Sequence, residues 1–232
     1  MKEKITRVAF SILIMAIVLF QFTILSKASE TISNEVIAWG LKRSDNHEPP
    51  KLDTASLEVL NKYKGLSIGN NEKKNLYLTF DLGYEAGYTA QILDILKQNN
   101  VKAVFFITGH YLNTQADLVK RMIEEGHTVG NHTVNHKSLP SLSNEEIEKE
   151  IMDLHKALFD KFGYEMTYFR PPKGEFSEKT LDIVTKLGYK SVLWSFAYDD
   201  WDENKQGREE YGKSKILDNL HNRKYYSFTC NK

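Results

Sequence analysis

The sequence predicts an α/β protein built on a parallel β-sheet, and three observations lead to this expectation. From Asn75 onward, short apolar runs of strand character alternate with helical patterns, which is typical of repeated strand–helix units. The 232 residues, 41% of them hydrophobic, suit one domain with one core better than two separate units. The sequence shows no internal repeat of the kind that builds solenoids.

The predicted elements follow one another along the chain. Strands are predicted at residues 76–80, 104–108, 128–130, 168–170 and 190–194, and helices at residues 90–98, 116–125, 144–162 and 177–187. Ser143 is a natural N-cap of the longest helix, and Glu146 completes a capping box. The glutamate-rich start of that helix is interpreted as a solvated face. Gly188 ends the last helix.

The N-terminus, residues 1–28, has the features of a signal peptide or a membrane anchor. Lys2, Lys4 and Arg7 precede a nearly unbroken apolar run, and small residues around Ala28 fit a signal-peptidase site. The run is also long enough to span a bilayer, so both alternatives remain open. Either way, we expect an exported protein that contacts the membrane only through this segment.

Charge and cysteine content exclude other classes of protein. Lys+Arg and Asp+Glu each number 31, so no nucleic-acid partner is expected. The single cysteine, Cys230, excludes a disulfide framework. Residues 29–74 are polar and turn-rich, and we expect an extended lead-in with one helix at residues 55–62, packed on the main domain. A monomer is expected.

Charged or metal-binding side chains lie at the ends of four of the predicted strands, and these are Asp81, His132, His136, Arg170, Asp199 and Asp200, with Trp201 beside them. In a parallel α/β barrel, the loops at the C-terminal ends of the strands share the face that carries the chemistry. Two histidines four residues apart can be solvated, but on a helical turn they would converge and could bind a divalent metal. Their place on this rim favours a metal site at His132 and His136.

Four motifs in this order, T-F-D-L-G, G-N-H-T-V-N-H, F-R-P-P-K-G-E-F-S and D-D-W, resemble those of the polysaccharide deacetylases (carbohydrate esterase family 4, NodB-like). W-G-L-K-R-S-D-N-H-E-P-P before the domain, together with T-F-D-L-G-Y-E-A-G-Y, resembles the spore-cortex enzymes that deacetylate N-acetylmuramic acid for δ-lactam formation. The resemblance implies a distorted (β/α) barrel over residues 75–232 and a hydrolase acting on the glycan strand of peptidoglycan.

The resemblance also implies roles for individual residues. Asp81 would be the general base, positioned by Arg170, and Asp200 would tune a proton-donating histidine from a later motif. His132 and His136 would bind a divalent metal, for which we expect Zn²⁺. The residues implied along the substrate groove are Pro171, Pro172, Gly174, Trp194 and Trp201.

Two residues depart from the family pattern. Leu82 stands where most members have a second aspartate that binds the metal, so we expect weak metal binding by two imidazoles. Glu85 is a candidate replacement ligand, and Lys173 replaces an aromatic residue usual after the prolines. Leu82 also favours one alternative, an impaired or inactive glycan-binding homologue. A further alternative is deacetylation of N-acetylglucosamine or chitin oligomers.

The tail from about Arg223 also departs from the family, which should supply a final strand ending in Leu-His. Codons allowed for residues 223–232, read one base later, can encode G-N-T-I-V-L-H-A-I. We therefore expect a frameshift near Asn222, which the nucleotide sequence tests; a divergent tail is the alternative. The barrel would be C-terminally incomplete, with an open sheet edge, an unpaired Asp200 and weak or no activity.

Overall fold

The computed structural model describes residues 32–44, 47–68, 75–200, 202–205 and 207–220, and the backbone alone of residues 224–229. The chain divides into Met1–Ser33 and a compact unit, Asn34–Lys232. The expected signal or anchor segment, Trp201 and Cys230 lie outside the described residues. Within the described part of the chain, no helix is long and apolar enough to cross a membrane.

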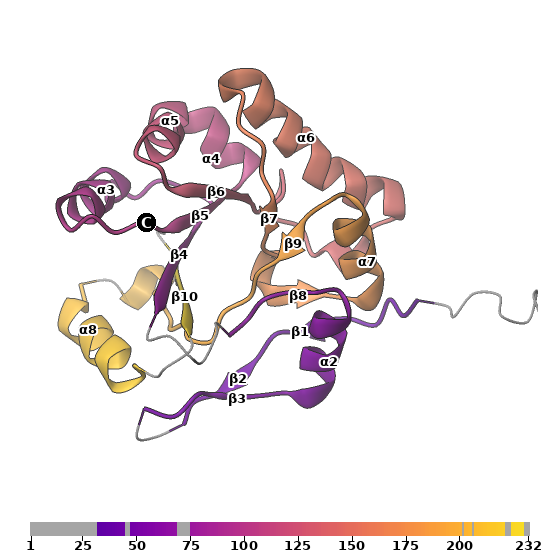
Figure 1. Ribbon diagram of the computed structural model, residues 1–232, viewed down its shortest axis with the longest axis horizontal. Helices are drawn as coiled ribbons and strands as arrows, with labels where there is room; N and C mark the ends of the chain where they lie inside the picture. The colour runs from indigo at the N-terminus through magenta and orange to yellow at the C-terminus, as the bar shows by residue number, and fades with distance from the viewer. Residues whose placement is uncertain are drawn as a thin grey trace, which may run out of the picture. The chain divides into compact units, whose positions relative to one another are not determined.

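A parallel sheet of six strands forms the centre of the compact unit, in the order β10-β4-β5-β6-β7-β9 (Figure 1). Its strands are β4 (Leu76–Leu82), β5 (Val104–Ile107), β6 (Thr128–Asn131), β7 (Tyr168–Phe169), β9 (Lys190–Ser191) and β10 (Lys224–Thr229). Beyond β9, Leu66 forms an isolated parallel bridge with Val192. The α/β fold and every strand predicted from the sequence are confirmed, and the parallel order brings the C-terminal ends of the strands to one rim.

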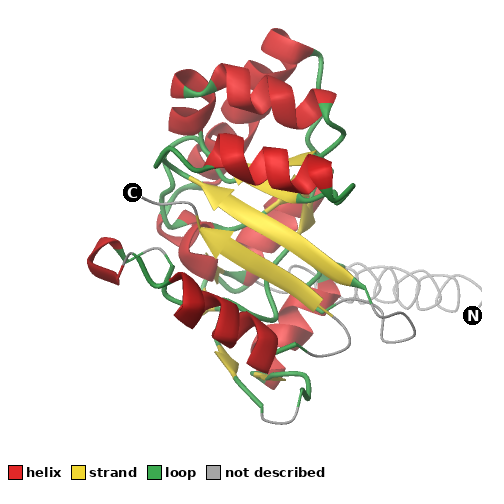
Figure 2. Ribbon diagram, turned by 90° about the vertical axis from the view of Figure 1, so that its left-hand side faces the viewer, coloured by secondary structure: helices red, strands yellow, loops and turns green. Residues whose placement is uncertain are grey.

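The sheet edge beside β4, expected to be open, is occupied by β10. The two strands pair in parallel from Lys224 opposite Leu76 to Thr229 opposite Asp81, and Figure 2 shows them side by side. The expectation of an open edge was wrong because K-Y-Y-S-F-T is rich in residues that favour strands, and β4 offers a row of backbone groups that need partners. The frameshift origin of the tail stays a prediction.

Helices cover the outer side of this sheet (Figure 1). They are α3 (Thr89–Gln98), α4 (Gly109–Thr114), α5 (Ala116–Glu124), α6 (Asn144–Phe162), α7 (Glu178–Lys186) and α8 (Glu209–Asp218), with short 3₁₀ turns at Leu139–Ser141, Pro172–Gly174 and Glu203–Lys205. The predicted helices are confirmed, and Ser143 and Glu146 form the expected capping box. The helices α4 and α8 were not predicted; Thr108 caps α4 by accepting a hydrogen bond from the Tyr111 N–H.

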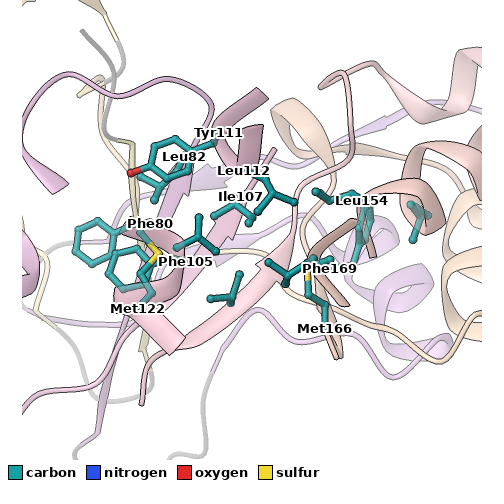
Figure 3. Close-up of a cluster of buried hydrophobic side chains, with 14 of the residues drawn as sticks. Phe80, Leu82, Phe105, Ile107, Tyr111, Leu112, Met122, Leu154, Met166 and Phe169 are labelled. Atoms are coloured by element: carbon teal, nitrogen blue, oxygen red, sulfur yellow. The ribbon is translucent and has the colours of Figure 1, made fainter. Parts of the chain in front are cut away.

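The main hydrophobic core fills the space between the sheet and these helices. Figure 3 shows Phe80 and Phe105 within it, and their rings stack with centroids 5.1 Å apart. Leu82 belongs to the same core, where it is fully buried and lies beside Tyr111 (Figure 3). The strand that carries Asp81 is therefore anchored in the core on both sides of that residue.

The lead-in packs on the domain, as expected, but it forms short paired strands rather than an extended segment. Strand β1 (Ile37–Ala38) pairs antiparallel with β8 (Glu175–Phe176), and β2 (Leu41–Lys42) pairs with β3 (Lys51–Leu52). The helix α2 (Thr54–Lys62) matches the predicted one and is capped by Asp53. A second core cluster joins the lead-in to the domain, and its buried members are Trp39, Leu60, Phe176, Leu181 and Leu193.

Gly130 in β6 leaves room for a core ring, which gives a test of the fold. A Cβ at Gly130 would lie 2.5 Å from the Phe106 ring, and Phe106 is fully buried and cannot give way. We expect Gly130→Ala to lower the free energy of unfolding, measured in urea, by about 1–3 kcal/mol. The control Gly40→Ala, whose Cβ meets nothing within 4 Å, should not lower it. Equal losses would contradict the packing described here.

Candidate active site

A charged pair formed by Asp81 and Arg170 lies at the centre of the candidate site. Asp81 is the penultimate residue of β4, and Arg170 directly follows β7. Arg170 Nη1 donates a hydrogen bond to Asp81 Oδ1 over 2.6 Å; the Arg170 side chain is fully buried and that of Asp81 is 14% exposed. Burial lowers the pKa of Arg170 and the charge of Asp81 counteracts this, so the guanidinium stays a cation.

Three further contacts fix the guanidinium in place. Arg170 Nε donates to the Val192 carbonyl over 3.1 Å, and the guanidinium carbon lies 4.3 Å from the Phe106 ring centroid and 5.6 Å from that of Trp194. Cation–π contacts of this kind favour a desolvated charge. Arg170 thus holds Asp81 through Oδ1, and the other carboxylate oxygen, Oδ2, faces His132.

His132 directs a ring nitrogen toward that oxygen. Its Nδ1 lies 2.8 Å from the Arg170 carbonyl, which can only accept, so Nδ1 carries the proton and Nε2 keeps its lone pair. Nε2 lies 3.9 Å from Asp81 Oδ2. Burial lowers the pKa of His132, so its imidazole is neutral near pH 7. This tautomer and charge state are the ones that a metal ligand requires.

His136 converges on His132, but not along a helical turn. The two ring centroids lie 4.8 Å apart, yet Thr133 has φ 68° and His136 has φ 55°, so this loop (residues 132–136) is left-handed at both. The helical spacing argument was therefore wrong, although the convergence is present. Desolvation of its ring and the adjacent His132 lower the pKa of His136 to about 4. His136 is nevertheless exposed to solvent as a whole residue.

Two buried polar residues that the sequence analysis missed hold this loop. Asn131 Oδ1 accepts from the Thr133 N–H over 2.9 Å, and its Nδ2 donates to the Ile151 carbonyl over 2.8 Å. Glu150 accepts from the N–H and the Nδ2 of Asn135 over 2.8 and 2.7 Å. These bonds connect the loop to α6 and compensate for its left-handed backbone.

The charged residues at the start of α6 are exposed as expected, except Glu150, which is only 6% exposed and contradicts the interpretation as a solvated face. It lies on the buried face of the helix, together with Ile147, Ile151, Leu154 and Leu158. A charged residue in an apolar stripe needs a buried partner. This spacing was the signal in the sequence that could have identified Glu150.

Neither Leu82 nor Glu85 joins the histidines. Leu82 is fully buried in the core, and Glu85 accepts hydrogen bonds from the Gly87 N–H, the Thr89 N–H and the Tyr111 hydroxyl over 2.6, 3.2 and 2.7 Å. Burial would raise the pKa of Glu85, but the hydrogen bonds from Thr89 and Tyr111 outweigh it and lower the pKa. Both carboxylate oxygens of Glu85 are thus engaged at the start of α3. The prediction that Glu85 is a replacement metal ligand was therefore wrong.

The donor set available to a metal is therefore small. Within the described residues, no group of three or more His, Cys, Asp and Glu side chains is arranged to hold an ion. The neutral imidazoles of His132 and His136 nevertheless suit a divalent metal, because both rings meet at the rim beside Asp81. The remaining coordination positions would fall to water or substrate.

The other predicted residues lie next to this centre. Pro171, Pro172 and Gly174 are buried in the turn after Arg170. Gly174 has φ +69°, and a Cβ there would lie 2.7 Å from the Trp194 ring, so only glycine fits. Trp194 packs over Arg170.

The lead-in supports this wall, because Trp39 Nε1 donates to the Trp194 carbonyl over 2.9 Å and the Trp39 N–H donates to the Gly174 carbonyl over 2.9 Å. Asp200 is partly buried and takes part in an interaction; that it lacks a proton-donating histidine as its partner stays a prediction. Trp201 cannot be placed, since it lies outside the described residues.

Comparison with known proteins identifies the family. A family model for polysaccharide deacetylase matches residues 68–192. The peptidoglycan-N-acetylmuramic acid deacetylase PdaA of Bacillus subtilis (strain 168) is 40% identical over 194 residues, 83% of this chain and 74% of that protein. A peptidoglycan-N-acetylglucosamine deacetylase of Bacillus cereus is 39% identical over 141 residues, 60% of this chain and 65% of that protein.

Among solved structures, that of Bacillus subtilis PdaA, a family 4 carbohydrate esterase, matches with a TM-score of 0.83 and 38% identity. The match covers 86% of each chain. The fold is therefore that of the NodB-like carbohydrate esterases, with a curled parallel sheet in place of a regular closed barrel, as the resemblance implied.

Glu150 offers a test of how the histidine loop is held. We expect Glu150→Gln to lower the free energy of unfolding by about 1–3 kcal/mol, because the Asn135 N–H loses a charged acceptor. It should also weaken Zn²⁺ binding, measured by isothermal titration calorimetry, since the loop loses its connection to α6. Glu148→Gln on the exposed side of the same helix is the control, and it should change neither quantity.

The lowered pKa values of the two histidines give a second test. The pKa of His136 is about 4, so its ring stays neutral as the pH falls from 7 to 5.5, and burial lowers the pKa of His132 in the same direction. Proton competition at His136 should set in only below about pH 5, so Zn²⁺ affinity should fall less over that range than it would with two ordinary imidazoles. Two histidines with ordinary pKa values near 6.5 would lose more than about tenfold, and such a loss would contradict the assignment.

Proposed function

The chain belongs to the polysaccharide deacetylase family, and we propose that it removes the N-acetyl group from N-acetylmuramic acid residues of peptidoglycan. One observation carries the proposal: a buried guanidinium holds Asp81 beside a neutral His132 at the C-terminal rim of the sheet. The similarity to PdaA over most of both chains supports the choice of substrate. We also propose that this reaction takes part in forming the muramic δ-lactam of the spore cortex.

Hydrolysis of an acetamide needs a base for water, stabilisation of the developing oxyanion and a proton for the leaving nitrogen. Asp81 accepts the proton from water through Oδ2, because Oδ1 is engaged by Arg170. Arg170 keeps the carboxylate oriented, and a fixed base pays no reorganisation cost during the reaction. Asp200 as the residue that tunes a proton-donating histidine stays a prediction.

A divalent metal, for which we propose Zn²⁺, fits the neutral donors of His132 and His136 and would be held weakly by them. When bound, it supplies polarisation of the acetyl carbonyl and a more acidic water. His132 contributes through the tautomer that its bond to the Arg170 carbonyl imposes.

The turn after Arg170 is proposed as one wall of the substrate groove. Pro171, Pro172 and Gly174 form a rigid turn against Trp194, and Trp39 braces it from the lead-in. We propose that this wall positions the sugar ring so that its acetamide faces Asp81. The site of action is outside the cytoplasm, at the cell wall or spore envelope, where the substrate occurs and where an export signal would deliver the protein.

A second candidate substrate is N-acetylglucosamine, because the Bacillus cereus relative is named for that activity. Glycan strands contain both sugars, so identifying which amino sugar appears after treatment separates the two candidates. An inactive glycan-binding homologue is the remaining candidate, and it would bind glycan without releasing acetate.

Acetate release tests the proposed function. Purified protein, with and without added Zn²⁺, should release acetate from glycan strands stripped of stem peptides and leave muramic acid with a free amine. Asp81→Asn should lower kcat by at least about 10²-fold, because the amide cannot take up the proton. No acetate from the folded protein under either condition would overturn the proposal.

Leu82→Asp gives an independent test of the metal site. Leu82 is fully buried, so a carboxylate there should lower the melting temperature of the metal-free protein. It also adds an oxygen donor next to Asp81, so Zn²⁺ should bind more tightly and raise the melting temperature more than in the unaltered protein. Leu82→Asn is the matched control without the charge. Sub-nanomolar Zn²⁺ affinity in the unaltered protein would instead reveal a missing ligand.

A further inference from the structure

Lys173 is an exposed lysine set in an otherwise buried turn of the candidate groove. Its neighbours Pro171, Pro172 and Gly174 are buried, whereas Lys173 is exposed. The turn is rigid on both sides, because Arg170 is fixed at Asp81 and Gly174 packs against Trp39 and Trp194. The direction of the Lys173 backbone is thus set by its surroundings.

The backbone of Lys173 is also strained. Its φ of 58° lies in the left-handed region, which a residue with a long side chain adopts only at a cost. Glycine or asparagine would take this conformation more easily. Strain at a rim position points to a role for the side chain that occupies it.

Lys173 lies on the same side of the site as His136. The strands β6 and β7 are neighbours, with Asn131 opposite Phe169; the loop of His132 and His136 leaves one strand and the turn of Lys173 leaves the other.

Within the described part of the chain, the Lys173 ammonium forms no ion pair with a carboxylate. Lys137, on the neighbouring loop, differs in this respect because its Nζ lies 3.6 Å from the buried Glu150. Lys173 therefore presents a cation at the rim that is available to an anion supplied by a ligand.

The chemistry of muramic acid supplies such an anion. Its acetamido group is on C2 of the ring, and its lactyl ether is on the adjacent carbon, C3. When no stem peptide is attached, the lactyl group ends in a carboxylate a few bonds from the amide that is cleaved. A cation beside the metal-binding histidines is therefore near the place where this carboxylate lies when the acetamide faces Asp81.

We propose that Lys173 is a specificity-determining residue that binds the lactyl carboxylate of muramic acid lacking its stem peptide. The inference rests on the proposed function for the location of the sugar. N-acetylglucosamine has no lactyl group, and in peptide-bearing muramic acid this carboxyl group is a neutral amide. Lys173 thus distinguishes the substrate from both by charge.

Binding of two matched ligands tests this inference without requiring turnover. One is a tetrasaccharide of alternating N-acetylglucosamine and N-acetylmuramic acid with free lactyl carboxylates. The other is the same tetrasaccharide with these carboxylates converted to methylamides. Calorimetry at low salt, with Zn²⁺ present, should show that the unaltered protein binds the carboxylate form about three- to tenfold more tightly.

The variants separate charge from structure. Lys173→Gln and Lys173→Asn should bind both ligands equally, Lys173→Arg should keep the preference, and the surface control Lys120→Gln, in α5, should behave like the unaltered protein. Lys173→Asn relieves backbone strain, so it serves if the glutamine variant is unstable. A preference that survives Lys173→Asn, or no preference in the unaltered protein, overturns the inference. Preferential binding without acetate release would instead overturn the proposed function and leave the role of Lys173 intact.

Discussion

The structure around the candidate site depends on one constraint, the complete burial of the Arg170 guanidinium. A buried cation is stable only when a partner charge and further hydrogen bonds replace its water. Asp81 on β4 and the Val192 carbonyl after β9 supply these, while Phe106 on β5 and Trp194 face the cation. One side chain therefore ties the central strands of the sheet together at the rim where the carboxylate is needed.

The packing around Arg170 explains several glycines and the lead-in. Phe106 can lie against the cation because Gly130 on the next strand has no side chain to displace it. Trp194 can do so because Gly174 leaves room for its ring, and Trp39 fixes its backbone. The lead-in thus belongs to the site, which accounts for a tryptophan far from the chemistry in sequence.

The sequence predicts those features of the fold and the candidate site that depend on residues close together in the chain. The strands, the long helix and its capping box are local patterns, and Asp81, Arg170 and the histidines were identified as candidates because each lies near the C-terminal end of a predicted strand. The left-handed loop of His136 and the two-residue strands of the lead-in depend on contacts between distant segments. Such contacts leave no periodic hydrophobic pattern in a single sequence. The pairing of β10 with β4 is also nonlocal, although its strand character was present in the residues.

Leu82 and Lys173 can be understood together through the charge of the site. A leucine in place of a second aspartate anchors β4 in the core, and it leaves the rim poorer by one negative charge. On our proposals, that loss weakens the hold on a metal cation, and it also leaves less negative charge beside the positive charges of Arg170, Lys173 and a metal that the histidines would hold. Such a site repels an anionic substrate less and attracts it more. On our proposals, the weak metal site and the lysine at the rim are therefore two consequences of one adaptation, a groove that accepts a sugar carrying its own carboxylate.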